Sequence, residues 1–509
     1  MGGQIMEPNF QYKNIALFRK PGSFVKIKEK KVRSVALWDV TKKCDLRCVH
    51  CYNYDKYMSS THSAGRETTT KEAIDIIDKL ADFGFNQIHF LGGEPLNRDD
   101  CLKLFAKAVS RGLAVSINSN GIRLTDEMME QLIDVGVSQL AISLDGSDAE
   151  SNDRIRGNGT FERIINNLNA AVKVKTRCNS DLQLGIVVTL TKPLLEEAGK
   201  TVAFFPLLDS LGINWLNYIF LYKNSKALYN ANILSYPMSM ALSVIENEVV
   251  EGMREYPNIY VQLDCRPLFG KYLNRKYGVF TYIHNFATKC SAGHKTWLIE
   301  ADGKVHPCGV CSTPDYGLLA AEAGCFKYNP LNMIDVQRYE QVNESQYFCT
   351  FRKYIRSKNN YNKFTTCMNC EFFGEVCLPC LLYSADGPVH ELKTCRIEEC
   401  EWTKEKMKKF YRQQEMKIPQ LCLNNIKIEN EKDESIRISI PSTKVSVKLS
   451  GTGLTIWKLI NGKNQIANLL NNLTHTYQKI PDRSILRREV VDFLYNLRDI
   501  KVLVLKGGD

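Results

Sequence analysis

Six short apolar segments alternate with amphipathic segments through about residue 222 of this 509-residue chain, and this alternation constrains the fold more than any other feature. The apolar segments are rich in Val, Ile, Leu and Phe and are apolar on both faces, which is typical of strands in a parallel sheet covered by helices. They span residues 35–40, 87–91, 114–118, 139–144, 183–190 and 214–221. Six such units predict an α/β fold with a right-handed, partial (β/α)6 barrel.

The segments between these strands carry helix signals. Thr69 and Glu72, for example, have the spacing of a capping box ahead of apolar residues at helical intervals. A short hairpin is expected earlier in the chain, at residues 15–20 and 24–28. Barrels of this kind place their active sites at the carboxyl ends of the strands, in the loops that follow them, so functional motifs are expected there.

Composition limits the classes of function. The first residues lack an apolar signal core and no apolar run approaches the ~20 residues that cross a bilayer, so we expect a cytoplasmic protein without membrane contact. In that reducing compartment the 18 cysteines indicate metal binding or redox chemistry more than disulfides. The net charge of +11 is spread along the chain among acidic residues, which argues against a nucleic-acid partner.

Three cysteines directly follow the first predicted strand. Cys44, Cys48 and Cys51 lie within eight residues on what should be a loop at the end of the strand. Three thiolates can hold three irons of a four-iron cluster and leave the fourth iron open to a substrate or cofactor. A zinc site is the alternative, but zinc generally takes four ligands and its usual units are paired CxxC motifs.

This CxxxCxxC loop resembles the signature of the radical S-adenosylmethionine (SAM) superfamily. The resemblance implies a 4Fe-4S cluster that reductively cleaves SAM, so that a 5′-deoxyadenosyl radical abstracts hydrogen from a substrate. His50 stands at the position that is usually aromatic and close to the adenine. The sequence Gly92-Gly93-Glu94-Pro95, after the second strand, is similar to the loop that binds the SAM amino group through backbone carbonyls and the Glu94 carboxylate.

The resemblance continues along the barrel, with one motif after each successive strand. The residues that match regions contacting the ribose and the methionyl carboxylate are Ser119, Asn120, Ser143 and Asp145. Arg156 resembles the arginine that pairs with that carboxylate, a role suited to its planar two-donor fork. Asn152 stands where relatives commonly have His. Each glycine pair or Asp-Gly alone could be a tight turn, but their order along one barrel rim favours a SAM site.

The cysteine-rich region, residues 284–400, resembles a SPASM domain, which carries two auxiliary four-iron clusters. That resemblance implies one cluster on Cys265, Cys290, Cys308 and Cys380, and another on Cys367, Cys370, Cys377 and either Cys395 or Cys400. The family's central run is usually Cx2Cx5Cx3C, so Cys377 is displaced by one residue. Further candidates are Cys311, Cys325 and Cys349, and without Cys265 the first cluster would have an open iron. The alternative is a zinc ribbon built from Cys367, Cys370, Cys377 and Cys380.

The last region shows three strand patterns, at residues 426–429, 436–440 and 445–449, followed by helical patterns. This order resembles the PqqD-like element, which holds the leader of a ribosomally made precursor peptide. A generic winged-helix module is the alternative. Because a free edge strand is a template for an extended peptide, we expect a leader to pair with residues 445–449.

These observations predict an N-terminal segment (1–33), a radical SAM barrel (34–225), a bridge (226–283), a SPASM domain (284–400), a helical linker (401–417) and a small α+β, winged-helix-like PqqD-type domain (418–509). The resemblance implies a precursor-peptide maturase with SAM, three 4Fe-4S clusters and an external flavodoxin- or ferredoxin-type electron donor. It would form a thioether or carbon–carbon cross-link. One alternative is a sulfatase-type or small-molecule enzyme of the same radical SAM kind. The other is a protein without enzymatic activity, either an iron-sulfur carrier or a peptide chaperone. The sequence identifies no residue that accepts or donates protons.

Overall fold

The computed structural model describes residues 34–57, 66–222, 225–278, 282–283, 291–313, 317, 319–322, 324–362, 365–370, 373, 380–381, 397–431, 435–441, 445–476 and 482–507. These residues form two compact units, which meet in the chain between Glu401 and Trp402. The predicted N-terminal hairpin lies outside the described residues, as do Cys290, Cys377 and Cys395.

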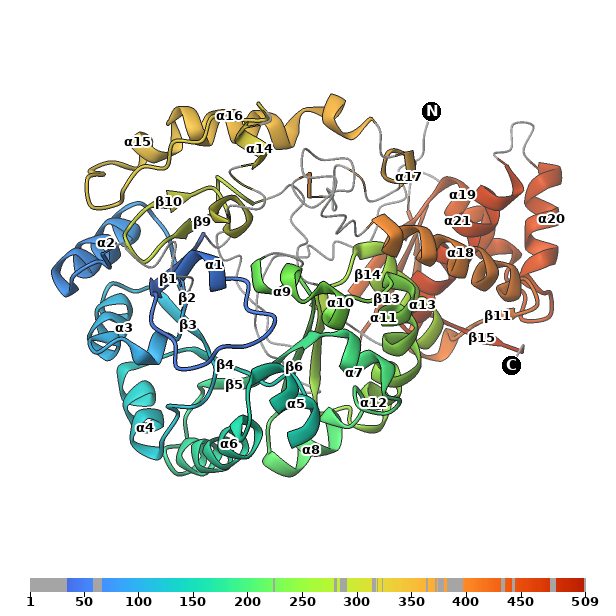
Figure 1. Ribbon diagram of the computed structural model, residues 1–509. Helices are drawn as coiled ribbons and strands as arrows, with labels where there is room; N and C mark the ends of the chain where they lie inside the picture. Colours follow the sequence, from blue (N-terminus) through green and yellow to red (C-terminus); the bar gives the residue numbers. More distant parts are fainter. Residues whose placement is uncertain are drawn as a thin grey trace. The chain divides into compact units, whose positions relative to one another are not determined.

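A parallel sheet forms the centre of the first unit and confirms the six predicted strands. These are β1 (Val35–Thr41), β2 (Gln87–Gly92), β3 (Ala114–Ser119), β4 (Gln139–Ser143), β5 (Gln183–Leu190) and β6 (Trp215–Phe220), each parallel to the next. The helices along its outer side are α2 (Thr70–Asp82), α3 (Cys101–Ser110), α4 (Asp126–Val135), α6 (Thr160–Arg177) and α8 (Phe204–Leu211), as Figure 1 shows. The carboxyl ends of the strands therefore share one rim, where the predicted motifs lie.

The sheet is wider than the six predicted strands, and within the described residues its order is β10-β9-β1-β2-β3-β4-β5-β6-β7-β8. β7 (Tyr260–Leu263) and β8 (Tyr282–Ile283) continue the parallel sheet beyond β6. On the other side β9 (Thr296–Ile299) runs parallel to β1, and β10 (Val305–His306) is antiparallel to β9. The bridge and the beginning of the cysteine-rich region thus both supply strands to the barrel sheet.

Helix signals read from the sequence are also confirmed. Thr69 caps α2: its hydroxyl accepts the N–H of Glu72, and the Glu72 carboxylate accepts the N–H of Thr69 at 2.8 Å. The bridge contains α11 (Met238–Val244) and α12 (Val250–Glu255), joined by one π-helical turn at Ile245–Val249.

Alternate residues of β1 face opposite sides of the sheet. Trp38 faces the helices, because it stacks on Phe90 of β2 at a centroid distance of 5.8 Å and Phe90 in turn meets Phe105 of α3 at 4.8 Å. Side chains alternate along a strand, so Asp39 points into the barrel. The opposite part of the interior is apolar, where Ala141, Val187 and Trp215 pack together. The barrel interior therefore has a charged side at β1 and an apolar side at β4 to β6.

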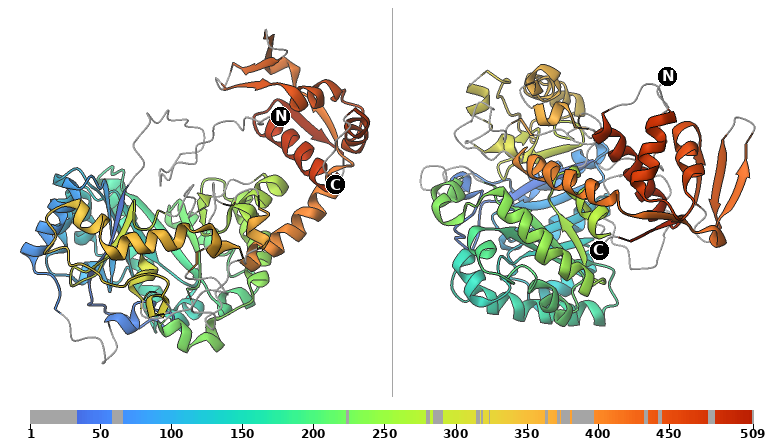
Figure 2. Two further views of the ribbon diagram at one scale, coloured as in Figure 1. Left: turned by 90° about the horizontal axis from the view of Figure 1, so that it is seen from above. Right: turned by 90° about the vertical axis from the view of Figure 1, so that its right-hand side faces the viewer.

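The second unit confirms the predicted order of three strands followed by helices. β12 (Lys427–Asn430), β13 (Ile436–Ile440) and β14 (Val445–Leu449) form an antiparallel sheet with β13 in the centre. The helices are α19 (Gly451–Leu459), α20 (Ile466–Thr476) and α21 (Arg483–Asp499), and the sheet lies beside them in both views of Figure 2. β11 (Ile418–Leu421) pairs with β15 (Leu503–Lys506). In the described part of the chain, no helix combines the length and hydropathy that crossing a bilayer requires.

Candidate functional site

The three cysteines predicted to hold a cluster lie together on the loop between β1 and α1 (Tyr54–Tyr57). Burial raises the pKa of Cys44 to about 11 and that of Cys51 to about 12. Burial also raises the pKa of Cys48, although the nearby charges of Arg156 and Lys226 act in the opposite direction. Such thiols ionise when a metal replaces their protons.

The residues on this loop fit a 4Fe-4S cluster. Three thiols lie within one short loop, and the cationic side chains of Arg156 and Lys226 lie close to Cys48. These groups would supply three ligands to a thiolate-ligated cluster and offset its negative charge. Among the described residues, no three Cys, His, Asp or Glu side chains meet closely enough to surround a single metal ion. A cluster does not require such convergence, because each thiolate binds a different iron.

The glycine pair after β2 lies directly against the backbone that leads into Cys44. The N–H of Gly93 donates to the carbonyl of Thr41 at 2.8 Å, and the N–H of Glu94 donates to the carbonyl of Lys43 at 2.7 Å. A Cβ atom on Gly93 would lie 2.1 Å from the Lys43 carbonyl oxygen, and one on Gly92 would lie 2.5 Å from that of Thr41. Only glycine permits this approach, which fixes the loop after β2 relative to the cysteine loop.

Glu94 is buried beside the cysteine loop and is held by the loop after β3. Its carboxylate accepts hydrogen bonds from the Ser119 hydroxyl at 2.9 Å and from the N–H of Asn120 at 2.7 Å. Burial nevertheless raises the pKa of Glu94 to about 7, because these hydrogen bonds only partly offset desolvation. Asn120 in turn donates to Asp45 at 2.6 Å and contacts the Cys44 sulfur at 3.9 Å. The structure thus brings Glu94, Ser119 and Asn120 together beside Cys44, while Pro95 begins the turn that follows.

Asp145, on the loop after β4, forms a buried ionic cluster with two other predicted residues. Its Oδ2 lies 2.8 Å from Nε of Arg156 and 3.1 Å from Nε2 of His50, and its Oδ1 accepts the N–H of Thr189 at 2.7 Å. Burial alone would raise the carboxyl pKa, but the charges of Arg156 and His50 hold the pKa of Asp145 well below its ordinary value. Arg156 and Asp145 are in contact without the alignment of a hydrogen bond.

This ion pair was not predicted from the sequence, which assigned both residues to SAM. Arg156 ends α5 (Ala149–Arg156), and its role toward the SAM carboxylate stays a prediction. Asn152, the departure from the usual His, holds the same loop: its Oδ1 accepts the N–H of Asp145 at 3.0 Å, and its Nδ2 donates to Thr160 at 2.9 Å. Ser143 is the last residue of β4.

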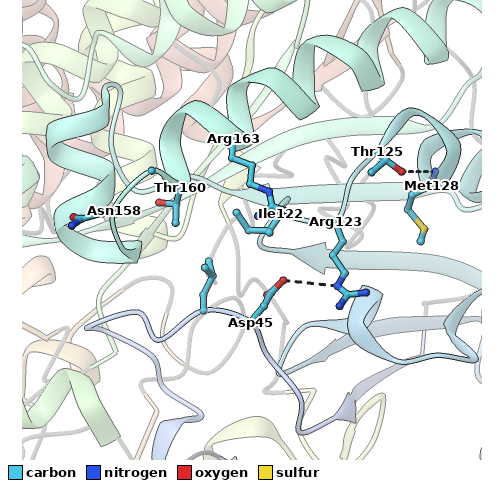
Figure 3. Close-up of a pocket in the computed structure, with 10 residues that line it drawn as sticks. Asp45, Ile122, Arg123, Thr125, Met128, Asn158, Thr160 and Arg163 are labelled. Carbon is cyan, nitrogen blue, oxygen red and sulfur yellow. Dashed lines mark hydrogen bonds and ion pairs between the residues drawn. The ribbon is translucent and has the colours of Figure 1, made fainter.

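Two cavities border the cysteine loop. One of about 580 Å³ is lined by Asp45 and Leu46 and by residues that follow β3 and α5, among them Ile122, Arg123, Thr160 and Arg163. Figure 3 shows Arg123 and Asp45 facing each other across it, with Nε and Oδ2 3.9 Å apart. The other cavity, of about 560 Å³, is lined by Cys44, Tyr57 and several charged residues, namely Lys42, Lys43, Asp45, Arg47, Asp99 and Arg123.

In the cysteine-rich region the structure groups Cys308 with Cys311. Their sulfurs are 3.5 Å apart, and the hydrogen bond lowers the pKa of Cys308 while burial raises that of Cys311. Cys380 is close enough that its charge raises the pKa of Cys311 further, and Tyr347 of α16 (Gln346–Arg356) hydrogen-bonds to the Cys311 thiol. Cys311 was only a further candidate in the sequence, although its spacing of two residues from Cys308 is a recognisable signal.

The backbone next to Cys265 does not lie with Cys308 and Cys311 but contacts the first turn of α18 (Ile397–Gln414). The N–H of Arg266 donates to the carboxylate of Glu399, which precedes Cys400 in the chain. The hydroxyl of Thr366, which precedes Cys367, donates to Glu401 at 3.1 Å. The structure therefore links the neighbours of Cys265, Cys367 and Cys400 at the beginning of this helix.

Comparison with known families gives two matches. Residues 38–190 match the radical SAM superfamily, and residues 439–503 match coenzyme PQQ synthesis protein D (PqqD). The first range begins in β1 and ends with β5, and the second runs from β13 to β15. These matches confirm the radical SAM and PqqD-like resemblances seen in the sequence.

Individual proteins are similar over different lengths. The AdoMet-dependent heme synthase of Methanosarcina barkeri is 30% identical over 281 residues, which cover 53% of this chain and 75% of that protein. Mycofactocin maturase MftC of Mycolicibacterium smegmatis is 34% identical over 152 residues, covering 30% of this chain and only 37% of the maturase. The crystal structure of Streptococcus suis SuiB bound to precursor peptide SuiA superposes with a TM-score of 0.52 at 16% identity, over 70% of this chain and 74% of SuiB. That structural match shows a shared fold.

Proposed function

The chain belongs to the radical SAM superfamily and is an enzyme, and we propose that it modifies a ribosomally made precursor peptide by forming a thioether or carbon–carbon cross-link. The observation that carries this proposal is the presence in one chain of a radical SAM domain and a PqqD domain. Two of the similar proteins support it, since one is named a maturase and the structure of the other contains a precursor peptide.

In this proposal Cys44, Cys48 and Cys51 would hold the 4Fe-4S cluster, and the bound cluster would supply the electron for reductive cleavage of SAM. The buried Glu94 carboxylate, with the carbonyls of its glycine loop, holds the SAM amino group. Arg156 pairs with the SAM carboxylate. The remaining contacts, to the ribose and the adenine, come from Ser119, Asn120, Ser143, Asp145 and His50.

We propose two further iron-sulfur centres, for which contacts among the described cysteines and their neighbours support two sets of ligands. Cys308, Cys311 and Cys380 lie together and form one set of ligands. Cys265, Cys367 and Cys400 belong to the other, because their neighbours meet at the start of α18. Cys370 joins them because its N–H donates to the carbonyl of Cys367. This proposal differs from the resemblance, which groups Cys265 with Cys308 and Cys380. The test is iron content: Cys311→Ala and Cys370→Ala should each lower it, whereas Cys178→Ala, at an exposed position of the barrel, should not. Full iron in both variants would contradict the assignment.

We propose that the leader pairs with β14, a strand at the edge of its sheet. Val447 of β14 and Ile428 of β12 both pair with Ile438 of β13, one from each side. Proline at Val447 removes a backbone donor and bends that edge, so leader binding should weaken. Ile428→Pro is the matched control on the opposite edge and should leave leader affinity unchanged. Equal losses in the two variants would contradict pairing at β14.

We propose that the external electron donor, an acidic flavodoxin or ferredoxin, docks on the basic residues around Cys44. Lys42, Lys43, Arg47 and Arg123 line the cavity that contains Cys44. Lys43→Glu should slow SAM cleavage driven by such a protein and leave cleavage driven by dithionite unchanged, because a small reductant needs no docking surface. Lys173→Glu, on exposed α6 surface, is the control. Equal slowing with both reductants would contradict docking at this surface.

The experiment that tests the whole proposal is turnover by the reconstituted enzyme under anaerobic conditions. A short cysteine-containing peptide encoded near this gene would be incubated with SAM and dithionite. We expect 5′-deoxyadenosine and a peptide that has lost two hydrogen atoms, seen by mass spectrometry. An iron-sulfur carrier or chaperone would produce no deoxyadenosine. Deletion of residues 418–509 should impair turnover of leader-bearing peptide and spare SAM cleavage.

A second candidate function rests on the length of the match to the heme synthase, which reaches 53% of this chain. In that case the substrate would be a small molecule of the haem-precursor class. Deoxyadenosine formation stimulated by an iron porphyrin and not by any peptide would favour this candidate over the peptide proposal.

A further inference from the structure

A buried charged cluster lies on the inner face of β1, apart from the residues assigned to SAM. Asp39 points into the barrel and is 1% exposed. Nζ of Lys56 lies 2.8 Å from its Oδ2, and the Tyr57 hydroxyl donates to the same oxygen at 2.7 Å. Figure 1 shows β1 next to β9, from whose end Glu300 completes the cluster with its carboxylate 3.1 Å from Lys56 Nζ.

The cluster joins two carboxylates to one ammonium group and one imidazole. Glu300 lies 3.3 Å from Nε2 of the buried His306, and although burial disfavours a charged lysine, Asp39 and Glu300 together raise the pKa of Lys56. The pKa of Glu300 is lowered to about 2, because Lys56 and His306 together outweigh the effect of burial. Lys56 is therefore already protonated and cannot accept a further proton. A carboxylate of the cluster can.

One oxygen of the cluster has no hydrogen-bond donor. Oδ1 of Asp39 is buried, and no donor among the described residues forms a hydrogen bond with it. A buried carboxylate oxygen without a donor is costly unless a ligand uses it. Oδ2, by contrast, is held by Lys56 and Tyr57, so the position of the free oxygen is fixed. Tyr57 also lines the cavity that contains Cys44, which places the cluster beside the site of radical formation.

The proposed reaction needs such a base. Forming the cross-link removes one hydrogen atom from the peptide, which the 5′-deoxyadenosyl radical takes to give 5′-deoxyadenosine. As the new bond closes, the peptide radical then loses one electron, to an iron-sulfur centre, and one proton. We propose that Oδ1 of Asp39 accepts this proton, with Lys56 and Tyr57 as positioning residues. This inference rests on the proposed peptide cross-linking.

The test measures cross-linked peptide formed per deoxyadenosine in the reconstituted full-length enzyme. Asp39→Asn keeps the size of the side chain and should retain iron and SAM cleavage while product falls about 100-fold, the lower range for loss of a general base. Asp39→Glu should restore part of the product, and Asp134→Asn, at an exposed position of α4, should behave as wild type. Unchanged product per deoxyadenosine in Asp39→Asn would overturn the inference.

A pH profile separates this role from a structural one and remains informative if Asp39→Asn does not fold. The groups of the cluster around Asp39 are Tyr52, Lys56 and Tyr57 from the segment after Cys51, Glu300 from the end of β9, and His306 of β10, which contacts Glu300. Tyr57→Phe removes one donor that stabilises the carboxylate, so the acid limb of product formation should move to higher pH. An unmoved limb would also overturn the inference. If wild-type enzyme cleaves SAM but makes no cross-linked peptide, the proposed function fails instead.

Discussion

Replacing Asp145 by Asn should destabilise the barrel by about 3–5 kcal/mol, the usual cost of removing one partner of a buried ion pair. The side chains of Asp145 and Arg156 are 0% and 7% exposed, and Oδ2 lies 2.8 Å from Nε. Asn has nearly the same shape and can still accept the Thr189 N–H, so the change removes the charge and little else. Arg156 then remains buried without a counter-charge.

The loss can be measured by urea unfolding at neutral pH, with hydrogen exchange of β5 to assign it to the barrel. The pKa of Asp145 lies below its ordinary value, so the carboxylate contributes its stability at every pH above the ordinary aspartate range and loses it only in strong acid. Neutral pH therefore reports the full effect. Adding Arg156→Gln to Asp145→Asn should recover much of the loss, because the buried charge is then gone.

The same variants test the predicted role of Arg156 toward SAM. If the SAM carboxylate approaches Arg156, it supplies the counter-charge that Asp145→Asn lacks, and saturating SAM should stabilise this variant more than wild type. A loss below about 1 kcal/mol, the range of exposed pairs, would refute the argument from burial. Equal stabilisation of both proteins by SAM would refute the role of Arg156.

Three other predictions concern the same rim. Changing Cys44, Cys48 and Cys51 together to Ala should remove roughly four irons per chain and abolish deoxyadenosine formation. The control Cys101→Ala, in the core, should keep both the iron and the activity. Undiminished deoxyadenosine in the triple variant would contradict the cluster assignment. Gly93→Ala should reduce SAM cleavage about 100-fold, because its Cβ would lie 2.1 Å from a backbone oxygen and displace the loop. A wild-type rate in a kinetic assay would show that the loop tolerates this displacement. Since the pKa of Glu94 is raised to about 7 and the SAM ammonium needs the ionised form, SAM affinity should fall about tenfold per pH unit below 7. Calorimetric titration should show this slope in wild type and not in Glu94→Gln.

The six central strands could be predicted from the sequence because a strand buried on both faces is a continuous apolar run. The outer strands could not, for reasons of length and context. β8 contains only Tyr282–Ile283, too short for any pattern. β9, Thr296–Ile299, is an apolar run, but it lies among cysteines and was therefore assigned to a region organised by metal. Its partner, β1, is more than 250 residues earlier in the chain.

The candidate site was predictable where residues form local motifs. The cysteine loop, the glycine pair and Asn120 each follow a predicted strand. The structure brings these three segments together at Cys44. Contacts between distant segments left no such signal. In the sequence, Asp39, Lys56 and Glu300 are ordinary charged residues. Only the fold shows that Lys56 is buried between the two carboxylates, where charged groups must pair.

The pairing of β9 with β1 has a consequence for anyone who exchanges modules between enzymes of this kind. Val35, at the start of β1, donates its N–H to the carbonyl of Lys295 at 2.7 Å. A chimera joined at residue 284 would therefore leave β1 as an unpaired edge, open to association with other chains. It would also remove Glu300 from beside Lys56. The part of the chain that must be kept together as the barrel therefore extends to the end of β10. A fragment from another enzyme that is joined after His306 preserves both the hydrogen-bonded edge of β1 and the charged interior of the barrel.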